Sequence, residues 1–456
     1  MFISCNPYSN ITNTEIPFES AEIYMEKANK GIQAFKHWKQ YSFDQKAALF
    51  KKLSFLLQEN KRRIAVQITG EMGKPIGQSI AEIEKCALTI DWYCEHGSDL
   101  LLPEEVKGLQ GAYATIHFEP LGTVLGIMPW NFPFWQVFRY AIPTLLAGNV
   151  TLLKHAPNVP LCARSIENLF LEAGFPEGVF QSIFVSTEDT GKLIESTGVH
   201  AVTFTGSEGA GRSIAAIAGK SLKKCVLELG GSDPFIVLAD TDLDVVVAHA
   251  ITGRLQNNGQ SCIASKRFII EEGIYNAFMQ QLKERVALLA FGDPMSETTD
   301  IGPLARPDLK TLLKNQLDRS VQAGAQVYYT HPFNDAGTNF FAPVILENIP
   351  FNCPARTEEL FGPVFSCFKA SDPNEAIHIA NETSFGLGAS IWSTDTVKAE
   401  TLAYNIESGS VFINGITKSD PRLPFGGIKH SGYGRELSVY GMHEFVNIKT
   451  YWKKNG

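Results

Sequence analysis

The stretch TVLGIMPWNFPFWQVFRYAIPTLLAGNVTLLKH, residues 123–155, decides the fold. Two short apolar runs, 123–128 and 150–154, read as strands, and the segment between them reads as a helix that ends near residue 147. A strand, a helix and a second strand in this order are typical of parallel sheets, because parallel neighbours need a crossover connection. Prolines and polar residues interrupt the stretch, so we do not expect it to cross a membrane.

The same alternation continues on both sides of residue 230. Further strands are expected at 180–185, 201–205 and 225–229, with helices at 161–173, 189–196 and 209–219. After Gly230 and Gly231 the pattern starts again, with strands at 235–238 and 266–270 and helices from 243 and at 274–289. We therefore predict an α/β fold with two doubly wound domains and a hinge near the glycine pair.

The two ends of the chain differ from this pattern. Residues 20–100 read as helical, with one amphipathic segment over 42–69. Residues 443–452 alternate like a strand, and a terminal strand with few local partners is expected to pair with another subunit. Together these features predict a helical layer at the start and a small β oligomerisation element at the end.

Composition narrows the function classes. The chain of 456 residues is too long for one hydrophobic core, and 44% hydrophobic and 19% charged residues are ordinary for a globular protein. A net charge of −8 gives no reason to expect nucleic acid or a membrane as partner. The eight cysteines form no C-x-x-C pair, so we expect no metal site and a reducing, cytoplasmic compartment. The first residues do not resemble a secretory signal.

Cys262 is the first candidate for chemistry. It ends the turn NNGQSC, residues 257–262, between an expected helix and an expected strand. Backbone amides in such a turn lower the pKa of a thiol and receive a developing oxyanion. The alternative is a buried cysteine that only fills space.

Glu228 and Asn131 are the next candidates. Glu228 ends an apolar strand before two glycines, where burial raises the pKa of a carboxyl toward that of a general base; the alternative is a salt bridge at the strand end. Asn131, in PWNFP, is a rigid amide donor suited to an oxyanion hole, unless it only caps a turn. In FTGSEGAG, residues 204–211, a strand meets a helix that would hold a phosphate, although the spacing is not G-x-G-x-x-G.

Seven short sequence blocks, spread in the same order over nearly the whole chain, resemble blocks of the aldehyde dehydrogenase superfamily. They are PWNFP (129–133), Lys154, FTGS (204–207), ELGG (228–231), GQSC (259–262), ELFGP (359–363) and PFGG (424–427). The resemblance implies the family's fold, with a nicotinamide-cofactor domain at 1–110 and 121–229 and a catalytic domain at 230–420. It also implies oligomerisation strands at 111–120 and 440–456, and a homodimer or homotetramer.

The resemblance also implies residue roles. Cys262 would be the nucleophile, Asn131 and the N–H of Cys262 the oxyanion hole, and Glu228 the base that activates water. Lys154 and Glu359 would hold the two riboses, and Ser207 a phosphate. The family's cofactor contacts fall on Trp130, Lys154, Pro157, Gly206, Ser207, Gly211, Leu229, Glu359 and Phe361. Because Pro157 replaces the glutamate of NAD-preferring relatives, both NAD and NADP are expected to serve.

Residues 154–157 and 228–234 resemble the succinate-semialdehyde branch of the family. Arg139, eight residues after Asn131, matches an arginine that holds the substrate carboxylate there; the alternative is a salt bridge. Gln256 stands where some relatives have a second arginine for the substrate, and Ser419 is a further candidate for binding the carboxylate. Ala264 stands where some relatives have a second cysteine that forms a redox switch, so no such switch is expected. The expected reaction is oxidation of succinate semialdehyde to succinate. Another small aliphatic or aromatic aldehyde, or a non-catalytic structural protein on this fold, stays open.

Overall fold

The computed structural model describes residues 1–454. A hairpin of β1 (Phe2–Cys5) and β2 (Thr12–Ile16) comes first. Four helices follow: α1 (Ala21–Trp38), α2 (Phe43–Glu59), α3 (Lys61–Met72) and α4 (Ile76–His96). The single helical segment expected over 42–69 is therefore wrong. Asn60 breaks it, because its φ of −99° and ψ of 5° end α2 and its side chain donates to the Leu56 carbonyl at 2.9 Å.

The first large sheet carries the strands expected from the alternation. Its order is β17-β9-β8-β5-β6-β7, and all neighbours are parallel except β17. The strands are β5 (Thr123–Met128), β6 (Val150–His155), β7 (Phe180–Ser182), β8 (Ala201–Thr205), β9 (Lys224–Glu228) and β17 (Gly432–Tyr433). The crossover helices are α5 (Trp135–Leu146), α6 (Pro160–Glu172), α7 (Thr187–Glu195) and α8 (Glu208–Lys220). The strand expected over 180–185 is shorter and ends at Ser182.

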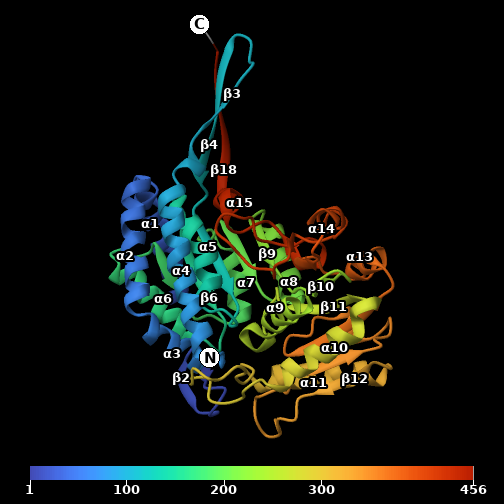
Figure 1. The fold of residues 1–456 in the computed structure, drawn as a ribbon. Coiled ribbons are helices and arrows are strands. Elements are labelled where there is room, and N and C mark those ends of the chain that lie inside the picture. The colour runs from blue at the N-terminus through green and yellow to red at the C-terminus, as the bar shows by residue number, and fades with distance from the viewer. Residues whose placement is uncertain (455–456) are drawn as a thin grey trace.

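The second large sheet has the order β12-β13-β14-β11-β10-β15-β16, with β12 as its antiparallel edge. Its strands are β10 (Asp233–Val237), β11 (Ser265–Glu271), β12 (Gln326–Thr330), β13 (Val344–Glu347), β14 (Val364–Ala370), β15 (Gly388–Trp392) and β16 (Ser410–Ile413). The helices are α9 (Leu243–Leu255), α10 (Glu272–Ala287), α11 (Pro307–Gln322), α12 (Pro354–Thr357), α13 (Pro373–Asn381) and α14 (Thr396–Ala403). The predicted α/β class with two doubly wound sheets is confirmed (Figure 1).

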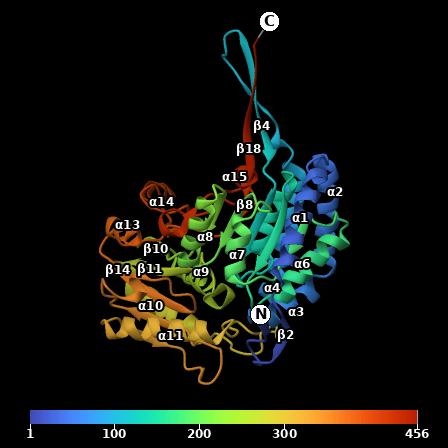
Figure 2. The same ribbon diagram turned by 180° about the vertical axis from the view of Figure 1, so that it is seen from behind.

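A narrow arm of three antiparallel strands projects from the body (Figures 1 and 2). It pairs β18 (Val446–Lys454) with β4 (Ala112–Pro120) and β4 with β3 (Glu104–Val106). Two expected boundaries are wrong. Residues 104–106, placed in the first domain, belong to the arm, and residues 440–443, placed in a strand, lie in α15 (Ser438–His443). The last two residues of the expected strand, 455–456, lie outside the described residues.

The end of α15 shows why the alternating pattern misled. His443 stacks on Phe118 with ring centroids 3.9 Å apart, and its Nε2 lies 2.6 Å from the Leu100 carbonyl. Gly441 and Met442 are buried, so both faces of this segment contact protein. Contacts with the rest of the protein therefore determine the conformation of this segment, in place of the alternating pattern that predicts a strand. The chain leaves the body at Val446. Within residues 1–454, no helix has the length and apolarity that a bilayer crossing requires.

A buried ion pair fixes the start of α5 against α4. The Lys74 ammonium pairs with Glu82, and both side chains are almost fully shielded from solvent. The second oxygen of Glu82 accepts the N–H groups of Phe134 and Trp135 at 2.8 and 2.9 Å. A carboxylate at this place satisfies amides that a helix start leaves without partners. The pair therefore holds the PWNFP segment in place from behind.

We predict that Lys74→Met lowers the free energy of unfolding by about 3–5 kcal/mol, because it leaves the Glu82 charge buried without its partner. Urea denaturation followed by tryptophan fluorescence measures the change. Lys61→Met is the matched control, since Lys61 pairs with Glu84 at 2.6 Å but both side chains are substantially exposed. The control should cost about 0–1 kcal/mol, and equal losses in the two variants would contradict the assigned role of the buried pair.

Candidate active site

A cavity of about 360 Å³ opens where three strands of the first sheet end and the Cys262 turn begins. β5 delivers residues 129–131, β8 delivers 205–207 and β9 delivers 229–230. The carboxyl ends of parallel strands are the usual place for a ligand in such sheets. The lining residues are Pro129, Trp130, Asn131, Gln136, Thr205, Gly206, Ser207, Leu229, Gly230, Cys262, Arg306, Leu309, Leu312, Glu359 and Phe361.

The turn before Cys262 has an uncommon backbone. Asn257, Asn258 and Gly259 have φ values of 56°, 58° and 78°, three left-handed residues in succession. Asparagine and glycine are the residues that adopt this conformation most readily. A side chain at position 259 would place its Cβ only 2.6 Å from the backbone of Gly362. The sequence NNG therefore allows the chain to reverse sharply and to pack against the loop after Glu359.

Side chains of the turn hold it to three distant segments. Asn257 Nδ2 donates to the Asn131 carbonyl at 2.6 Å. Asn258 Nδ2 donates to the Gly73 carbonyl at 3.2 Å. Gln260 Oε1 accepts the Ala305 N–H at 3.0 Å. The position of Cys262 is thus set by contacts with both large domains and with the helical layer.

Lys266 holds the turn from beneath. Its ammonium donates to the carbonyl oxygens of Ser261 and Cys262 at 2.9 and 2.8 Å and lies 3.3 Å from Glu359. The side chain is buried, and burial lowers the pKa of Lys266, opposed chiefly by Glu359. The two hydrogen bonds to carbonyl oxygens fix the backbone at Ser261 and Cys262.

Burial dominates the titration of Cys262 itself. It raises the pKa of the thiol to about 11, and the positive charges of Arg139 and Lys266 only partly oppose this. The expectation that backbone amides lower the pKa of this thiol is therefore wrong for the ligand-free protein. The desolvation cost of a thiolate outweighs the stabilisation that neighbouring dipoles and cations supply.

Asn131 lies beside the thiol with a fixed orientation. Gln136, the second residue of α5, donates from Nε2 to Asn131 Oδ1 at 3.0 Å. Asn131 Nδ2 donates to the Gln260 carbonyl at 3.0 Å, which occupies one of its two hydrogens. The second hydrogen is available to an oxygen in the cavity. Gln136 was missed by sequence reasoning, although its place five residues after Asn131 in a short segment was a usable signal.

Glu228 ends β9 beside the cavity, and both of its carboxyl oxygens are buried without a hydrogen-bond partner. Burial raises the pKa of Glu228 well above its ordinary value, and repulsion from Glu436 adds to the effect. Gly426 makes room for the carboxyl, since a Cβ there would lie 2.7 Å from Glu228 Oε1. Within residues 1–454 no cation is close enough to form the salt bridge that was the alternative reading.

The other half of the cavity is shaped for a long ligand. Ser207 is the N-cap of α8 but makes no side-chain cap, so the first amides of this helix are open. A Cβ at Gly206 would lie 2.5 Å from the Phe204 ring, and one at Gly211 2.5 Å from Leu229. Trp130 and Phe361 meet edge to face with ring centroids 5.9 Å apart. Glu359 Oε1 accepts the Gly231 N–H at 3.1 Å.

Some predicted residues lie outside the cavity. Lys154 is half-buried at the end of β6, with its ammonium 5.6 Å from the centroid of the Phe2 ring. Burial lowers the pKa of Lys154 to about 8. Pro157 is exposed three residues further on, and Gln256 is exposed at the end of α9. Gly211 lies behind Leu229, so its role is close packing of α8 rather than ligand contact.

Arg139 and Ser419, the expected substrate anchors, both have protein partners. Arg139 forms a buried ion pair with Glu436, and its Nη2 donates to Thr205 at 3.3 Å. A salt bridge was the stated alternative for Arg139, and it is present in the protein interior. Ser419 is buried and accepts a hydrogen bond from Lys85 at 2.6 Å. Sequence reasoning missed Lys85 and Glu436, because neither belongs to a motif.

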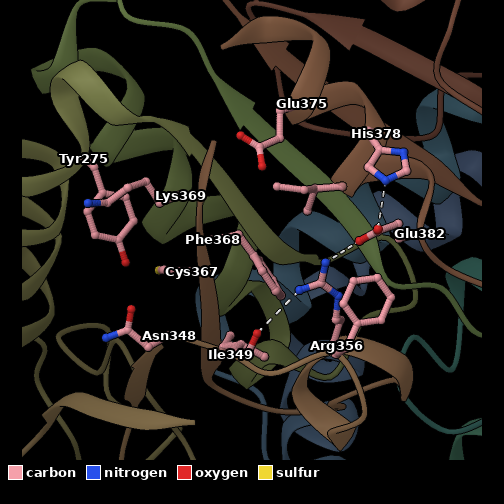
Figure 3. A pocket seen from close by; sticks show the side chains of 12 residues that line it. Tyr275, Asn348, Ile349, Arg356, Cys367, Phe368, Lys369, Glu375, His378 and Glu382 are labelled. Carbon is pink, nitrogen blue, oxygen red and sulfur yellow. Dashed lines mark hydrogen bonds and ion pairs between the residues drawn. The ribbon is translucent and has the colours of Figure 1, made fainter. Parts of the chain in front are cut away.

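A second cavity, of about 410 Å³, is lined by residues of α10, β14 and α13, among others (Figure 3). Arg356 reaches toward it but pairs with Glu382, and His378 lies 3.1 Å from the same carboxylate. Cys367 lines it, but burial raises the pKa of this thiol above its ordinary range. None of the predicted site residues faces this cavity, so the cavity at Cys262 is the candidate active site.

Comparisons with known proteins agree with this geometry. A chain from Synechocystis described as a probable NADP+ succinate-semialdehyde dehydrogenase is 46% identical over 94% of this chain and 93% of its own length. The succinate semialdehyde dehydrogenase Sad of Escherichia coli K12, described as using NAD(P)+, is 44% identical over 99% and 97%. The crystal structure of the Streptococcus pyogenes succinic semialdehyde dehydrogenase with NADP+ superposes with a TM-score of 0.97, at 34% identity over all of both chains. A sequence model of the aldehyde dehydrogenase family matches residues 1–451, and the chain belongs to that family.

Proposed function

We propose that this enzyme oxidises succinate semialdehyde to succinate with NAD or NADP as the electron acceptor. The observation that carries the reaction type is one cavity that joins a thiol, an oriented amide donor and an open helix N-terminus, with an unpaired buried carboxyl directly behind it. Relatives named as succinate-semialdehyde dehydrogenases, at 44–46% identity, support the substrate.

The residues present fit a dinucleotide. The uncapped start of α8 offers backbone N–H groups to a phosphate. Gly206 and Gly211 allow Phe204 and Leu229 to pack closely against this turn. Trp130, Glu359 and Phe361 line the same cavity on the way to Cys262. When bound, NAD(P)+ supplies the acceptor for one hydride.

The chain's own groups perform the covalent chemistry. Cys262 Sγ, after losing its proton, forms a bond to the aldehyde carbon, and the carbonyl electron pair moves to oxygen. The free hydrogen of Asn131 Nδ2 and the Cys262 N–H stabilise that oxyanion. Loss of the hydride restores the carbonyl and leaves a thioester on Cys262, so one difficult oxidation becomes two simpler steps.

Glu228 acts in the second step. It removes a proton from water, the resulting hydroxide adds to the thioester carbon, and the carbon–sulfur bond breaks to release the carboxylate and the Cys262 thiolate. A carboxyl with a raised pKa is a stronger base than an ordinary glutamate, which suits this task near neutral pH. All three reacting groups are in place, which argues against a non-catalytic structural protein.

A second candidate substrate is an uncharged small aldehyde. The observation that favours it is the Arg139–Glu436 ion pair, which already neutralises the expected carboxylate anchor. The two candidates share every step of the chemistry and differ only in what lies at the far end of the substrate.

We also propose that the arm mediates a homodimer or homotetramer. Ile448, Tyr451 and Trp452 on β18 are 62%, 46% and 60% exposed, a large apolar surface for a projecting strand pair. All eight cysteines are free, which suits the reducing cytoplasm that we propose as the compartment.

The substrate proposal predicts that kcat/KM for succinic semialdehyde exceeds that for butanal, an uncharged analogue of similar length. A charge-assisted hydrogen bond contributes about 1.5–3 kcal/mol, which corresponds to a ratio of about tenfold to a hundredfold. Reduced nicotinamide absorbance measures both rates. Equal values would reject succinate semialdehyde in favour of the uncharged substrate and would leave the aldehyde dehydrogenase assignment intact.

The raised pKa of Cys262 predicts slow alkylation of the ligand-free enzyme near neutral pH. Because only the thiolate reacts, the iodoacetamide rate at Cys262 should climb about tenfold per unit between about pH 7 and pH 10. Mass spectrometry of the Cys262 peptide gives the rate. Free N-acetylcysteine is the reference, with a rate that levels off near its pKa of about 8.5. A Cys262 rate that levels off near neutral pH would disprove the dominance of burial.

Cofactor choice is tested at Pro157. Pro157→Glu should lower kcat/KM for NADP by at least about tenfold, since a carboxylate there repels the phosphate of NADP at short range. The change for NAD should be much smaller. Pro157→Gln is the matched control without charge, and it should leave the ratio between the two cofactors near that of the parent. A parallel fall for both cofactors in Pro157→Glu would place residue 157 away from the phosphate.

A further inference from the structure

Lys266 lies directly behind the cavity and contacts two of the residues that line it. Its ammonium donates to the Cys262 carbonyl at 2.8 Å and lies 3.3 Å from Glu359 Oε1. Cys262 and Glu359 both line the cavity, whereas the Lys266 side chain is buried. One ammonium therefore connects the backbone that carries the thiol with the carboxylate of the ELFGP block.

The backbone of β11 is irregular at Lys266. In the pairing of β10 with β11, Ser265 and Arg267 lie opposite successive residues of β10, so Lys266 has no opposite residue. The pairing of β11 with β14 begins only at Arg267. Bulges of this kind are rare between parallel strands, redirect a side chain and are over-represented next to active sites. Here the side chain of the bulged residue reaches the carbonyl oxygens of the Cys262 turn.

The two carboxylate oxygens of Glu359 have different surroundings. Oε1 accepts the Gly231 N–H at 3.1 Å and is the oxygen that pairs with Lys266. Oε2 accepts no hydrogen bond from residues 1–454 and lies over Gly230, where a Cβ would be only 2.3 Å from it. A carboxylate that is held through one oxygen presents the other to a ligand, and it accepts from hydroxyl groups such as those of a ribose.

Glu359 is the one carboxylate within ion-pair distance of Lys266 among residues 1–454. Burial lowers the pKa of Lys266, and the charge of Glu359 is the largest influence that opposes this. The other partners of the ammonium are carbonyl oxygens, which carry no full charge. A buried cation of this kind is stabilised by its carboxylate, so the ion pair holds Glu359 in one place.

We propose that Lys266 is a positioning residue for the cofactor: it holds Glu359 Oε1 so that Oε2 accepts a ribose hydroxyl, and it fixes that acceptor relative to the backbone of Cys262. The inference rests on the proposed function, in which NAD or NADP occupies this cavity. Lys266 itself touches neither the cofactor nor the reacting atoms. Its effect therefore passes through Glu359, and removal of Lys266 weakens cofactor binding only while Glu359 is present.

The experiment measures Kd for NADPH from its fluorescence in the parent enzyme, in Lys266→Met, in Glu359→Gln and in the double variant. Each single change should weaken binding about tenfold to a hundredfold, the range of one charge-assisted hydrogen bond. The double variant should bind within about threefold of the weaker single variant, since both changes remove the same contact. Lys369→Met is the control, because it removes a charge from an exposed ion pair on the same sheet, and it should keep the Kd of the parent.

The outcomes separate the two proposals. A parent enzyme that binds neither NADPH nor NADH would overturn the proposed function, and the role of Lys266 with it. A parent enzyme that binds NADPH and a Lys266→Met variant that binds it equally well would overturn the role of Lys266 and leave the proposed function standing. Two losses that multiply in the double variant would do the same, because Lys266 would then act independently of Glu359.

A second measurement covers a Lys266→Met variant that does not fold. Glu359→Gln leaves the Lys266 charge buried without its carboxylate and should raise the unfolding equilibrium constant in urea about tenfold to a hundredfold. Glu358→Gln is the matched control, since Glu358 pairs with Arg319 at 2.8 Å at the surface. The control should change the constant at most about fivefold, and equal changes in the two variants would overturn the proposal.

Discussion

The active site depends on one backbone feature, the left-handed turn of Asn257, Asn258 and Gly259. Such a turn carries strain unless surrounding contacts maintain it. Here the PWNFP segment, the α3–α4 connection and the segment before α11 each bind one of its side chains or carbonyls. The turn can therefore hold Cys262 steady only when the helical layer and both sheets are assembled. The position of Cys262, the proposed nucleophile, therefore depends on the whole fold rather than on the sheet that follows it.

Burial favours the neutral forms of Cys262 and Glu228, the two proposed reacting acids. The pKa values of Cys262 and Glu228 are raised by the same cause, the loss of water around them. The cations that act on Cys262 already have protein partners, since Lys266 donates to carbonyl oxygens and Arg139 pairs with Glu436. A positive charge that enters the cavity would favour the ionised form of both acids. Burial and nearby charge therefore act in opposite directions on the ionisation of these two groups.

The sequence predicted the architecture well where local pattern and tertiary structure agree. The strands at 123–128 and 201–205 have the expected bounds, because buried parallel strands are continuous apolar runs. The motif residues Asn131, Ser207, Cys262 and Glu359 meet in one cavity. Asn131 and Ser207 do so because they follow the carboxyl ends of neighbouring parallel strands. The pattern failed at α15, where contacts with Phe118 and Leu100 decide the structure. It also missed Gln136, Lys266 and Lys85, whose importance arises from neighbours far away in the sequence.

The proposed reacting groups and the buried charged side chains of this fold are held by different kinds of contact. Groups that break and form bonds come from strand ends and the Cys262 turn, and these are fixed by backbone contacts. Charged groups on α4 and α5 are held by side-chain contacts instead, since Lys85 donates to Ser419 and Arg139 pairs with Glu436. The hydrogen bonds that fix the Cys262 turn include neither of these two cations, so the two sets of contacts are separate. A buried charge without a full partner favours a ligand that completes it, so such charges can change between proteins while the backbone contacts around the thiol are kept.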